Sequence, residues 1–436
     1  MLDGMLLFVA LAGLLFLRFP VFIALIIVGS CAHIFALGID AWWHWVSFSP
    51  WSMVSHYHYS AIPLFLLMGQ IATDGNITKD LFSAADKALK GQRGSLSIAT
   101  IISCTIFGSL CGSSLATAST MTPVSYKEMK LRNYSNEIIF GTLAAGGTLG
   151  VLVPPSIVLV IYAIIAEESV ASLSIAAIIP AIMAFVGYIA AIKYFAYKYP
   201  ADVPKNSPHL DKHKPVEDKH KLWISLTCIF LLFVVMLSGL YTGKFMPTEA
   251  AAVGVIGVLA IVAFMGNFRS LNWSVIFSET AKTTAIIMAI FVGAEIVNTA
   301  LAALDFPEEF SEYVLSRGEY PMLVIFIMIF ALIILGCFMD GIAITLLVVP
   351  LLLPIVSEMN LGIEHVGIWF GIIILIIVEI GLITPPLGLN LFVIKSIEPG
   401  LQNVRVIKAI KYFLVSDIVR ISLLVLIPTI MIFPSG

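Results

Sequence analysis

Long apolar segments recur along the whole chain and are interrupted by Pro, Gly and short polar loops. A helix that crosses a bilayer needs about 20 predominantly apolar residues. Several of the apolar segments are too short to cross alone, and the short ones cluster around two pairs of matching motifs. The pattern predicts full or partial membrane spans at 4–17, 20–38, 59–73, 95–109, 138–152, 155–166, 172–198, 222–242, 247–266, 280–303, 320–336, 343–357, 365–382, 386–396 and 413–433.

Composition agrees with this pattern. The chain has 436 residues, of which 60% are hydrophobic and 12% are charged, whereas a soluble domain carries about 25% charged residues. We therefore predict an all-α polytopic membrane protein, because lipid requires each spanning element to satisfy its own backbone groups.

The net charge of −3 gives no indication of nucleic-acid binding. The five cysteines show no paired spacing and are expected to be small buried hydrophobic residues. The first four residues lack the basic region of a signal peptide, so the first apolar run is expected to be retained.

One hydrophilic segment, 200–221, lies near the middle of the chain and holds five lysines. The positive-inside rule predicts that this linker is cytoplasmic. An amphipathic segment around Phe82 has a counterpart around Phe310, 228 positions later, and both are expected at the membrane surface. The expected domains are N-terminal scaffold helices in 1–58, a first repeat in 59–199, scaffold or arm helices in 222–279 and a second repeat in 280–436.

Tryptophans concentrate in one region. Four of the seven lie between positions 42 and 51, which is typical of an aromatic belt at the membrane interface. His44, His56 and His58 in the same region are an alternative metal site, although no carboxylate or cysteine accompanies them at ligand spacing.

Gly-, Ser- and Pro-rich sequence interrupts the apolar runs twice in the same order. Segments 108–117 and 336–345 start and end 228 positions apart, and segments 150–156 and 381–387 start 231 positions apart. Each first motif separates two apolar runs, which predicts a re-entrant hairpin near 95–123 and near 320–357. Each second motif contains a Pro-Pro pair, which predicts a broken helix near 138–166 and near 365–396. Two copies indicate a duplicated fold with a site where the copies meet.

Such breaks leave backbone groups that are tolerated at membrane depth only where protein or a watery cavity covers them. Free carbonyls at half-helix ends bind Na⁺, whereas half-helix N-termini favour an anion. Gly permits close approach of the backbone, and Ser and Thr add small hydroxyl ligands or donors. The matched motifs together predict a cation-coupled carrier. For any one motif alone, the alternative is close helix packing by small residues.

Several polar residues within this apolar chain have two readings. A carboxylate at the bilayer centre costs about 2.5–3.5 kcal/mol on insertion scales, so Asp340 needs a role. It either caps the returning half-helix or organises a Na⁺ or substrate site, and the two roles are compatible. Asn390 either donates to an anionic substrate or satisfies broken-helix backbone. Glu249 is expected in the first turn of a helix that Thr248 caps.

Two further carboxylates, Glu295 and Glu379, lie inside apolar runs and need partners. Lys282 and Lys395 are the candidates, and spacing does not assign them.

Three common catalytic signatures are absent from the sequence. There is no P-loop motif, no His-Glu-x-x-His and no Gly-x-Ser-x-Gly. We therefore predict a secondary transporter rather than an enzyme, driven by an ion gradient or by another chain.

At these motifs the chain resembles the large membrane (M) subunit of tripartite ATP-independent periplasmic (TRAP) transporters, over nearly its whole length. The most specific pieces are 112–117, 147–156, 247–254, the Asp340-Gly341 hairpin and 384–392. The resemblance implies an elevator-type carrier with inverted-topology repeats and two hairpins in a mobile transport domain. It implies Na⁺-coupled uptake of an organic acid anion across the bacterial inner membrane. The substrate is expected in the C4-dicarboxylate or sialic-acid class, with a lean towards the sialic-acid branch.

The resemblance also implies partners. A periplasmic substrate-binding (P) protein delivers the substrate, and a small four-helix membrane (Q) subunit, which this chain lacks, is expected as a separate protein in the same phospholipid bilayer.

The resemblance further implies a site with about two or more Na⁺ ions around the hairpins and helix breaks. Because Val153 stands where the second copy has Thr384, it offers only its carbonyl, so the two cation sites differ. By spacing, Asp340 takes the place of Gly112. The residues expected at Na⁺ are Gly108, Ser109, Gly150, Val153, Pro155, Gly336, Gly341, Gly381, Thr384 and Leu387. The residues expected at the substrate are Ser113, Ser114, Thr117, Asp340, Pro386, Gly388 and Asn390.

Two other functions remain as alternatives. A stand-alone dicarboxylate or citrate Na⁺ symporter of similar architecture would transport free substrate without a binding protein. A non-transporting scaffold or channel subunit would not need paired broken helices.

Overall fold

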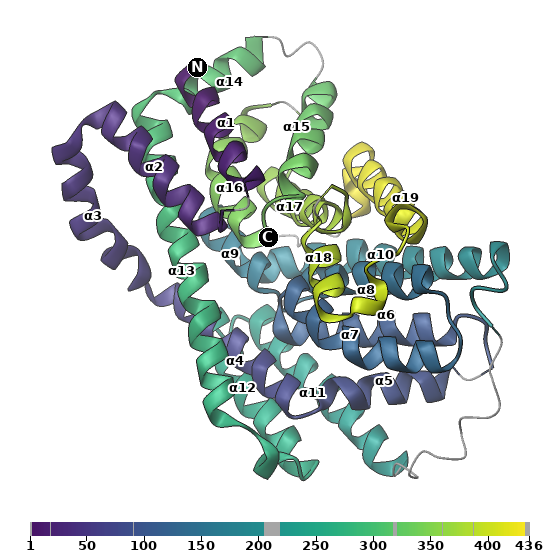
Figure 1. Ribbon diagram of the computed structural model, residues 1–436. Helices are drawn as coiled ribbons and strands as arrows, with labels where there is room; N and C mark the ends of the chain where they lie inside the picture. Colours follow the sequence, from purple (N-terminus) through teal and green to yellow (C-terminus); the bar gives the residue numbers. More distant parts are fainter. Residues whose placement is uncertain are drawn as a thin grey trace.

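The computed structural model describes residues 2–17, 19–89, 91–204, 219–316, 321–359, 361–386 and 388–431. Within these ranges the chain is helical and has no strand, which confirms the predicted all-α class (Figure 1). Most of the linker, 205–218, lies outside the described residues. The first helices are α1 (Leu2–Phe16), α2 (Val21–Leu37), α3 (Ile39–Val54), α4 (Ala61–Asp74) and α5 (Ile77–Ala88). They are followed by α6 (Ser95–Cys111), α7 (Ser114–Leu131), α8 (Asn136–Leu152), α9 (Ile157–Ile165) and α10 (Val170–Lys198).

The second half continues in the same manner. Its helices are α11 (Lys219–Tyr241), α12 (Pro247–Phe264), α13 (Trp273–Ala303), α14 (Phe306–Ser316), α15 (Pro321–Gly336), α16 (Gly341–Glu358), α17 (Val366–Ile383), α18 (Leu389–Ile397) and α19 (Val406–Leu426).

Several helices are long and apolar enough to cross a membrane. Among the described residues these are α10, α12, α13, α16 and α17, and a sixth span results if α8 and α9, which meet at an angle of 45°, are counted together. The chain is therefore a multi-pass membrane protein. The predicted spans each correspond to a helix, and most ends differ by a few residues. Helix α13 begins seven residues before the predicted segment, and α19 both begins and ends seven residues before it.

Some helices were not among the predicted spans. The Trp-rich region forms α3, which has no buried residue and exposes Trp43 and Trp51. The two segments predicted to be amphipathic form α5 and α14. Three cysteines are buried as expected, but Cys228 is only half-buried and Cys31, in α2, is exposed.

The core lies around α8 and α17. All residues of α8 from Ile138 onward and all residues of α17 from Ile368 onward are buried. A helix that is apolar on every side is expected in such a central position. The indole of Trp369 in α17 donates to the carbonyl of Leu424 in α19 at 3.0 Å, which ties the last long helix to this core.

The same succession of helices occurs twice. The helical hairpin α6–α7 is followed by α8, a Pro-Pro break and α9, and the hairpin α15–α16 is followed by α17, a Pro-Pro break and α18. Proline ends each central helix because it lacks a backbone donor and clashes with the preceding turn. Packing between the two sets is crossed, since α9 packs on α16 and α18 packs on α7. The two hairpins are therefore held together by the short helix of the opposite set.

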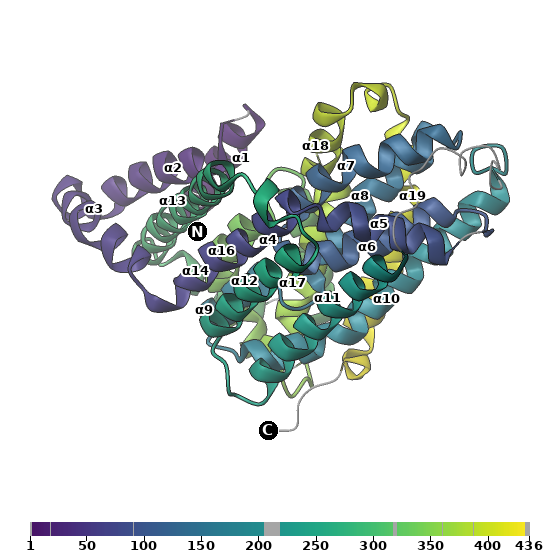
Figure 2. The same ribbon diagram turned by 90° about the horizontal axis from the view of Figure 1, so that it is seen from below.

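Helices α1, α2, α3 and α13 lie together at one side of the molecule (Figure 2), and α13 joins them to the main bundle by packing on α4 and α16. Among these helices α2 and α13 pack together along most of their length. Gly29 and Gly293 allow this approach, because a Cβ on Gly29 would lie 2.5 Å from Cγ2 of Ile296 and 3.0 Å from the backbone nitrogen of Val297. Close packing of small residues is a common means of helix association in membranes.

One predicted helix start differs in detail. Glu249 lies in the first turn of α12 as expected, and its carboxylate accepts from the backbone N–H of Met246 at 2.8 Å. The cap residue is Met246, not Thr248, because the helix begins two residues earlier than a Thr248 cap implies, at Pro247. Proline suits this position since its missing donor is not needed there.

We predict that Gly29→Ala destabilises the protein. The added methyl group meets backbone atoms that cannot yield, and such overpacking costs about 1–3 kcal/mol. Gly13→Ala in α1 is the matched control, because nothing lies within 4 Å of its Cβ position. Thermal unfolding in detergent should show a lower midpoint for Gly29→Ala only. An unchanged midpoint would mean that the α2–α13 contact is not as close as described.

Candidate functional site

The tip of the first hairpin is built by a glycine and a serine. Gly112 adopts a left-handed conformation (φ 61°), which ends α6 and turns the chain. Ser113 then caps α7, and its hydroxyl accepts from the backbone N–H of Ala116 at 3.3 Å. Gly112 is also required by space, since a Cβ there would lie 3.0 Å from the backbone nitrogen of Ile157, the first residue of α9. The tip therefore sits against the Pro-Pro break of its own set.

The tip of the second hairpin uses a carboxylate in the same role. Asp340 caps α16, and its Oδ1 accepts from the backbone N–H of Ala343 at 3.3 Å. The capping interpretation of Asp340 is thus confirmed. In the structure Asp340 takes the place of Ser113, whereas the spacing predicts that it takes the place of Gly112. The difference arises because the segment from Gly336 to its cap is one residue shorter than the segment from Gly108 to its cap.

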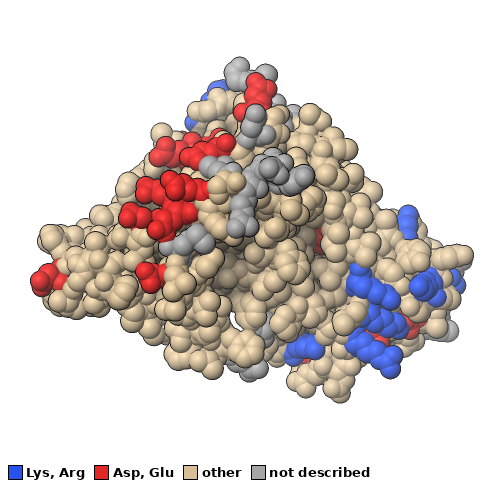
Figure 3. Space-filling view, turned by 90° about the horizontal axis from the view of Figure 1, so that it is seen from above, with Lys and Arg blue, Asp and Glu red and all other residues tan. Residues whose placement is uncertain are grey.

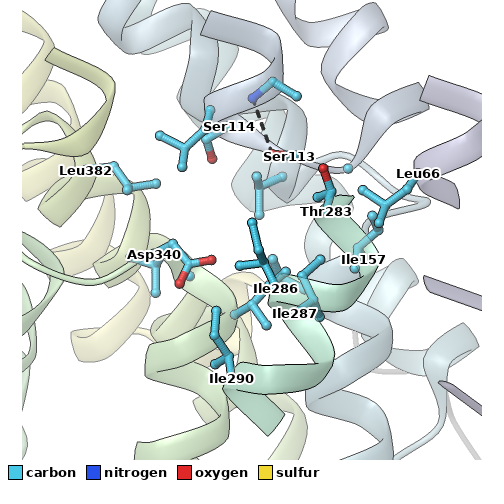
Figure 4. Close-up of a pocket in the computed structure, with 18 of the residues that line it drawn as sticks. Leu66, Ser113, Ser114, Ile157, Thr283, Ile286, Ile287, Ile290, Asp340 and Leu382 are labelled. Atoms are coloured by element: carbon cyan, nitrogen blue, oxygen red, sulfur yellow. Dashed lines mark hydrogen bonds between the residues drawn. The ribbon is translucent and has the colours of Figure 1, made fainter. Parts of the chain in front are cut away.

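The two tips meet in one cavity of about 380 Å³. Its wall includes Ser113 and Ser114 from the first tip and Asp340 and Gly341 from the second. The carboxylate of Asp340 lies across the cavity from the serines, and isoleucines of α13 close another side (Figure 4). Three predicted substrate residues, Ser113, Ser114 and Asp340, are thereby brought together. The α13 residues Thr283, Ile286, Ile287 and Ile290 were not predicted, because no motif marks them.

Three helices begin at the wall of this cavity. The N-termini of α7, α9 and α16 contribute Ser114, Ile157 and Gly341 to its lining. The N-terminus of a helix carries roughly half a positive charge and unpaired N–H groups, which favours an anion. Among the described lining residues there is no lysine or arginine. The cavity therefore offers a bound anion backbone dipoles and hydroxyl groups, and no basic side chain.

The predicted Na⁺ residues meet at two helix crossings. In the first set, α6 and α8 touch at Gly108 and Gly150, where a Cβ on Gly108 would lie 2.5 Å from Cα of Gly150. In the second set, α15 and α17 touch at Gly336 and Gly381, where a Cβ on Gly381 would lie 2.6 Å from the carbonyl carbon of Gly336. All four helices end within a few residues of these crossings, so the carbonyl-rich C-terminal ends lie together in pairs. That arrangement suits a cation.

Threonines accompany both crossings. Thr117 lies beside Gly108, where its hydroxyl donates to the carbonyl of Ser113 at 2.8 Å and approaches Sγ of Cys111 at 3.1 Å. Thr117 therefore belongs with the first crossing and does not line the cavity. In the second set Thr384 ends α17, and its hydroxyl donates to the carbonyl of Ile380 at 2.5 Å.

The other predicted Na⁺ residues lie near these points. Val153 ends α8 at the position that Thr384 holds in α17. Pro155 is buried in the first break, and the Ser109 hydroxyl donates to the carbonyl of Ile106 at 2.7 Å. Gly341 is the first residue of α16 and lines the cavity. Leu387 lies outside the described residues.

The remaining predicted substrate residues do not line the cavity. Pro386 is exposed in the second break, and Gly388 precedes α18 with φ 49°. Asn390 is fully buried against α8, where its Nδ2 donates to the carbonyl of Ala144 at 3.4 Å. Ala144 lies inside α8 and not at its broken end, and Oδ1 of Asn390 has no partner among the described residues, so both predicted roles of Asn390 stay open.

A buried ionic network was missed by the sequence analysis. Nη2 of Arg420 lies 2.9 Å from Oε2 of Glu379 and 3.0 Å from Oδ1 of Asp417, and all three side chains are at most 2% exposed. The Tyr188 hydroxyl donates to Oδ2 of Asp417 at 2.8 Å and lies 3.5 Å from Oγ1 of Thr148. The network thus joins α8, α10, α17 and α19. The sequence feature that could have indicated this network is the presence of charged residues at 417 and 420 inside an apolar run.

The partners considered for the two buried carboxylates were wrong. Lys282 pairs with Glu279 one turn away at 2.9 Å, and Lys395 lies 5.6 Å from the ring centre of Phe140. Glu379 pairs with Arg420 instead. Glu295 lines a separate cavity of about 430 Å³ between α13 and α16.

The histidine-rich region does not form a metal centre in the part of the chain that the structure describes. No group of three His, Cys, Asp or Glu residues there is placed to hold an ion.

Comparison with known proteins gives one consistent family. Residues 8–430 match the family model for the tripartite ATP-independent periplasmic transporter, DctM component. The chain is 33% identical over 343 residues to a C4-dicarboxylate TRAP transporter large permease protein from Pseudomonas aeruginosa, covering 78% of each chain. It is 28% identical over 389 residues to a sialic acid TRAP transporter large permease protein from Vibrio cholerae, covering 88% of this chain and 87% of the relative. An isethionate TRAP transporter permease protein from Oleidesulfovibrio alaskensis is 27% identical, over 86% of this chain and 58% of that protein.

We predict that Arg420→Met destabilises the protein severely. Removing the guanidinium leaves two buried carboxylates without their cation, which costs about 3–5 kcal/mol. Lys282→Met is the matched control, because its ion pair with Glu279 is 66% and 45% exposed and contributes less than about 1 kcal/mol. Chemical or thermal unfolding in detergent measures both changes.

A triple variant separates the lost pairing from lost packing. Arg420→Met combined with Glu379→Gln and Asp417→Asn removes all the charges and should recover most of the stability. If the triple variant is as unstable as Arg420→Met alone, the unpaired charges are not the cause.

Proposed function

This chain belongs to the DctM component family of TRAP transporters, and we propose that it performs Na⁺-coupled uptake of an organic acid anion by an elevator mechanism. The observation that carries the proposal is the cavity between the hairpin tips. Three helix N-termini border it, and its described wall holds no basic side chain. An anion bound there needs a further positive charge, since helix ends alone supply only partial charges. Bound Na⁺ ions provide that charge and thereby link anion binding to the ion gradient.

The two glycine crossings are the proposed Na⁺ sites, and they imply about two or more ions. Paired helix C-termini at Gly108–Gly150 and Gly336–Gly381 present carbonyl oxygens, which suit hard cations. The second site additionally has the hydroxyl of Thr384, whereas the first has the side chain of Val153 at that position. The second site is therefore the more polar one.

The elevator mechanism and the inverted-topology repeats are inferred from the two helix sets. The crossed packing of α9 on α16 and of α18 on α7 makes the hairpins and broken helices one unit. We propose that this unit is the transport domain. Helices α1, α2, α3 and α13, which lie together at one side in Figure 2, are proposed as part of the scaffold against which it moves. Residues of α13 face the cavity from the scaffold side.

The proposed orientation follows from charge. Acidic side chains gather on the side of α14, and lysines and arginines gather on the side where α10 ends (Figure 3). By the positive-inside rule, the end of α10 faces the cytoplasm and α14 faces the periplasm. The proposed location is the bacterial inner membrane, where a periplasmic side exists.

Partners and substrate class are proposed from the relatives. Their names describe TRAP transporters for C4-dicarboxylates, sialic acid and isethionate, all of which are organic acids. We propose a periplasmic substrate-binding protein and a separate small membrane subunit as partners, and an organic acid anion as substrate. The dicarboxylate and sialic-acid relatives give no basis for preferring the sialic-acid branch, because a dicarboxylate relative is the more similar of the two.

We predict that proteoliposomes take up the organic acid only when all components are present. These are this chain, the small subunit, the substrate-loaded binding protein and an inward Na⁺ gradient. Removing any one should reduce uptake of radiolabelled substrate to the level of empty liposomes. Uptake of free substrate by this chain alone would favour the stand-alone symporter. Unchanged uptake by both Ser113→Ala and Asp340→Ala would favour a scaffold subunit.

We also predict that Thr384→Val weakens Na⁺ dependence. The variant removes one hydroxyl and makes the second site resemble the first, which costs about 1 kcal/mol or more. The Na⁺ concentration for half-maximal uptake should rise by roughly fivefold or more. Thr100→Val is the control. The Thr100 hydroxyl is also buried and donates to the carbonyl of Leu96, one turn earlier, at 2.8 Å. Thr100 lies far from the glycine crossing along α6. An equal shift in both variants would count against a Na⁺ site at Thr384.

A further inference from the structure

An apolar groove runs along the outer face of the bundle between α10 and α19. It encloses about 800 Å³. Gly187, Ala190 and Ala191 make it shallow on the α10 side because they have little or no side chain, while Ile182 and Val186 stand at its rim and are 56% and 58% exposed. The helices touch beneath it, where a Cβ on Gly187 would collide with Oγ of Ser416. The groove is thus a feature of the backbone packing.

The length of the groove matches one leaflet of a bilayer. It extends along α10 from Ile182 to Tyr194, twelve residues, or about 18 Å of helix. Half of the hydrocarbon core is about 15 Å thick. The far end lies beside Arg420, whose guanidinium is engaged with Glu379 and Asp417. Because the Arg420 side chain is only 2% exposed, the surface of that end consists mainly of Ile182, Met183, Val186 and Val419, which suits the end of an acyl chain.

The near end of the groove is aromatic and basic. The rings of Tyr194 and Tyr412 meet edge to face at 5.2 Å and line the groove. Nζ of Lys411 lies 4.9 Å from the ring centre of Tyr412, and Nζ of Lys198 lies 6.0 Å from that of Tyr194. Within the described part of the chain, neither lysine has a carboxylate at ion-pair distance, whereas the neighbouring Lys408 is paired with Asp202 at 3.1 Å. Two positive charges therefore remain to be matched.

We propose that this groove binds one anionic phospholipid of the cytoplasmic leaflet. An acyl chain fills the apolar part between α10 and α19, and the headgroup phosphate lies between Lys198 and Lys411. Charge complementarity selects this occupant, because the cytoplasmic leaflet carries the anionic lipids and basic pockets between helices on that side hold their headgroups. The site requires a membrane location with the end of α10 at the cytoplasmic surface, and it does not depend on Na⁺ coupling.

The test measures lipid binding to the purified, delipidated full chain in detergent. Native mass spectrometry should show one tightly bound phosphatidylglycerol, and added phosphatidylglycerol should raise the thermal unfolding midpoint. Zwitterionic phosphatidylcholine and inorganic phosphate should do neither. Replacing both lysines (Lys198→Ala with Lys411→Ala) should weaken phosphatidylglycerol binding by roughly 30-fold, at about 1 kcal/mol for each basic residue.

Two further variants separate the site from general electrostatics. Ala190→Trp should block the groove and abolish the lipid-dependent stabilisation while both lysines remain. Lys127→Ala with Lys130→Ala on α7 is the matched charge control and should leave binding unchanged. The proposal is overturned if the control loses as much affinity as the groove variants, or if inorganic phosphate alone gives the same stabilisation. It is also overturned if the assembled transporter, with its small subunit, binds no phosphatidylglycerol, since protein would then cover the groove.

Discussion

The structure depends on helix ends that are buried in an apolar interior. A continuous helix satisfies its own backbone, but each end leaves about four N–H or C=O groups without an intrahelical partner. In lipid such groups have no water to bind, so the ends must be enclosed by protein. Two hairpins and two Pro-Pro breaks place many such ends in the interior of the protein. The buried α8 and α17, the crossed packing of the short helices and the glycine contacts all serve to enclose them.

The helix ends are also sorted by sign. N-termini of α7, α9 and α16 lie at one cavity, and the C-terminal ends of α6 with α8 and of α15 with α17 lie at two crossings. Only glycine allows the second arrangement, because a Cβ at Gly108 or Gly381 would collide with the opposite backbone. This sorting of helix ends is the basis of the proposal that an anion and Na⁺ ions bind close together without basic side chains.

Much of this arrangement was predictable from sequence because its chemistry is local. Glycine, serine and proline within apolar runs identify the hairpin tips and breaks, and repetition at nearly constant spacing identifies their pairing. What was missed depends on contacts between distant segments. Arg420 and Glu379 are 41 residues apart on different helices, and nothing in either segment reports which faces meet. The correspondence of Asp340 with Ser113 was missed for another reason, since a cap is defined by backbone geometry and the two tips differ by one residue.

The crossed packing bears on how the cavity would open. Its two tips belong to different hairpins, and each returning helix is held by the short helix of the other set. Separating the tips would expose the ends of α9 and α18 together with both crossings. The boundary with α13 is different, because it consists largely of Ile286, Ile287 and Ile290, whose aliphatic side chains make few directional contacts. Among the described residues one side-chain hydrogen bond crosses it, from Nδ2 of Asn298 to the carbonyl of Leu346 in α16 at 3.2 Å. A boundary of aliphatic contacts with so few directional bonds supports the proposal that the hairpins and broken helices move as one body.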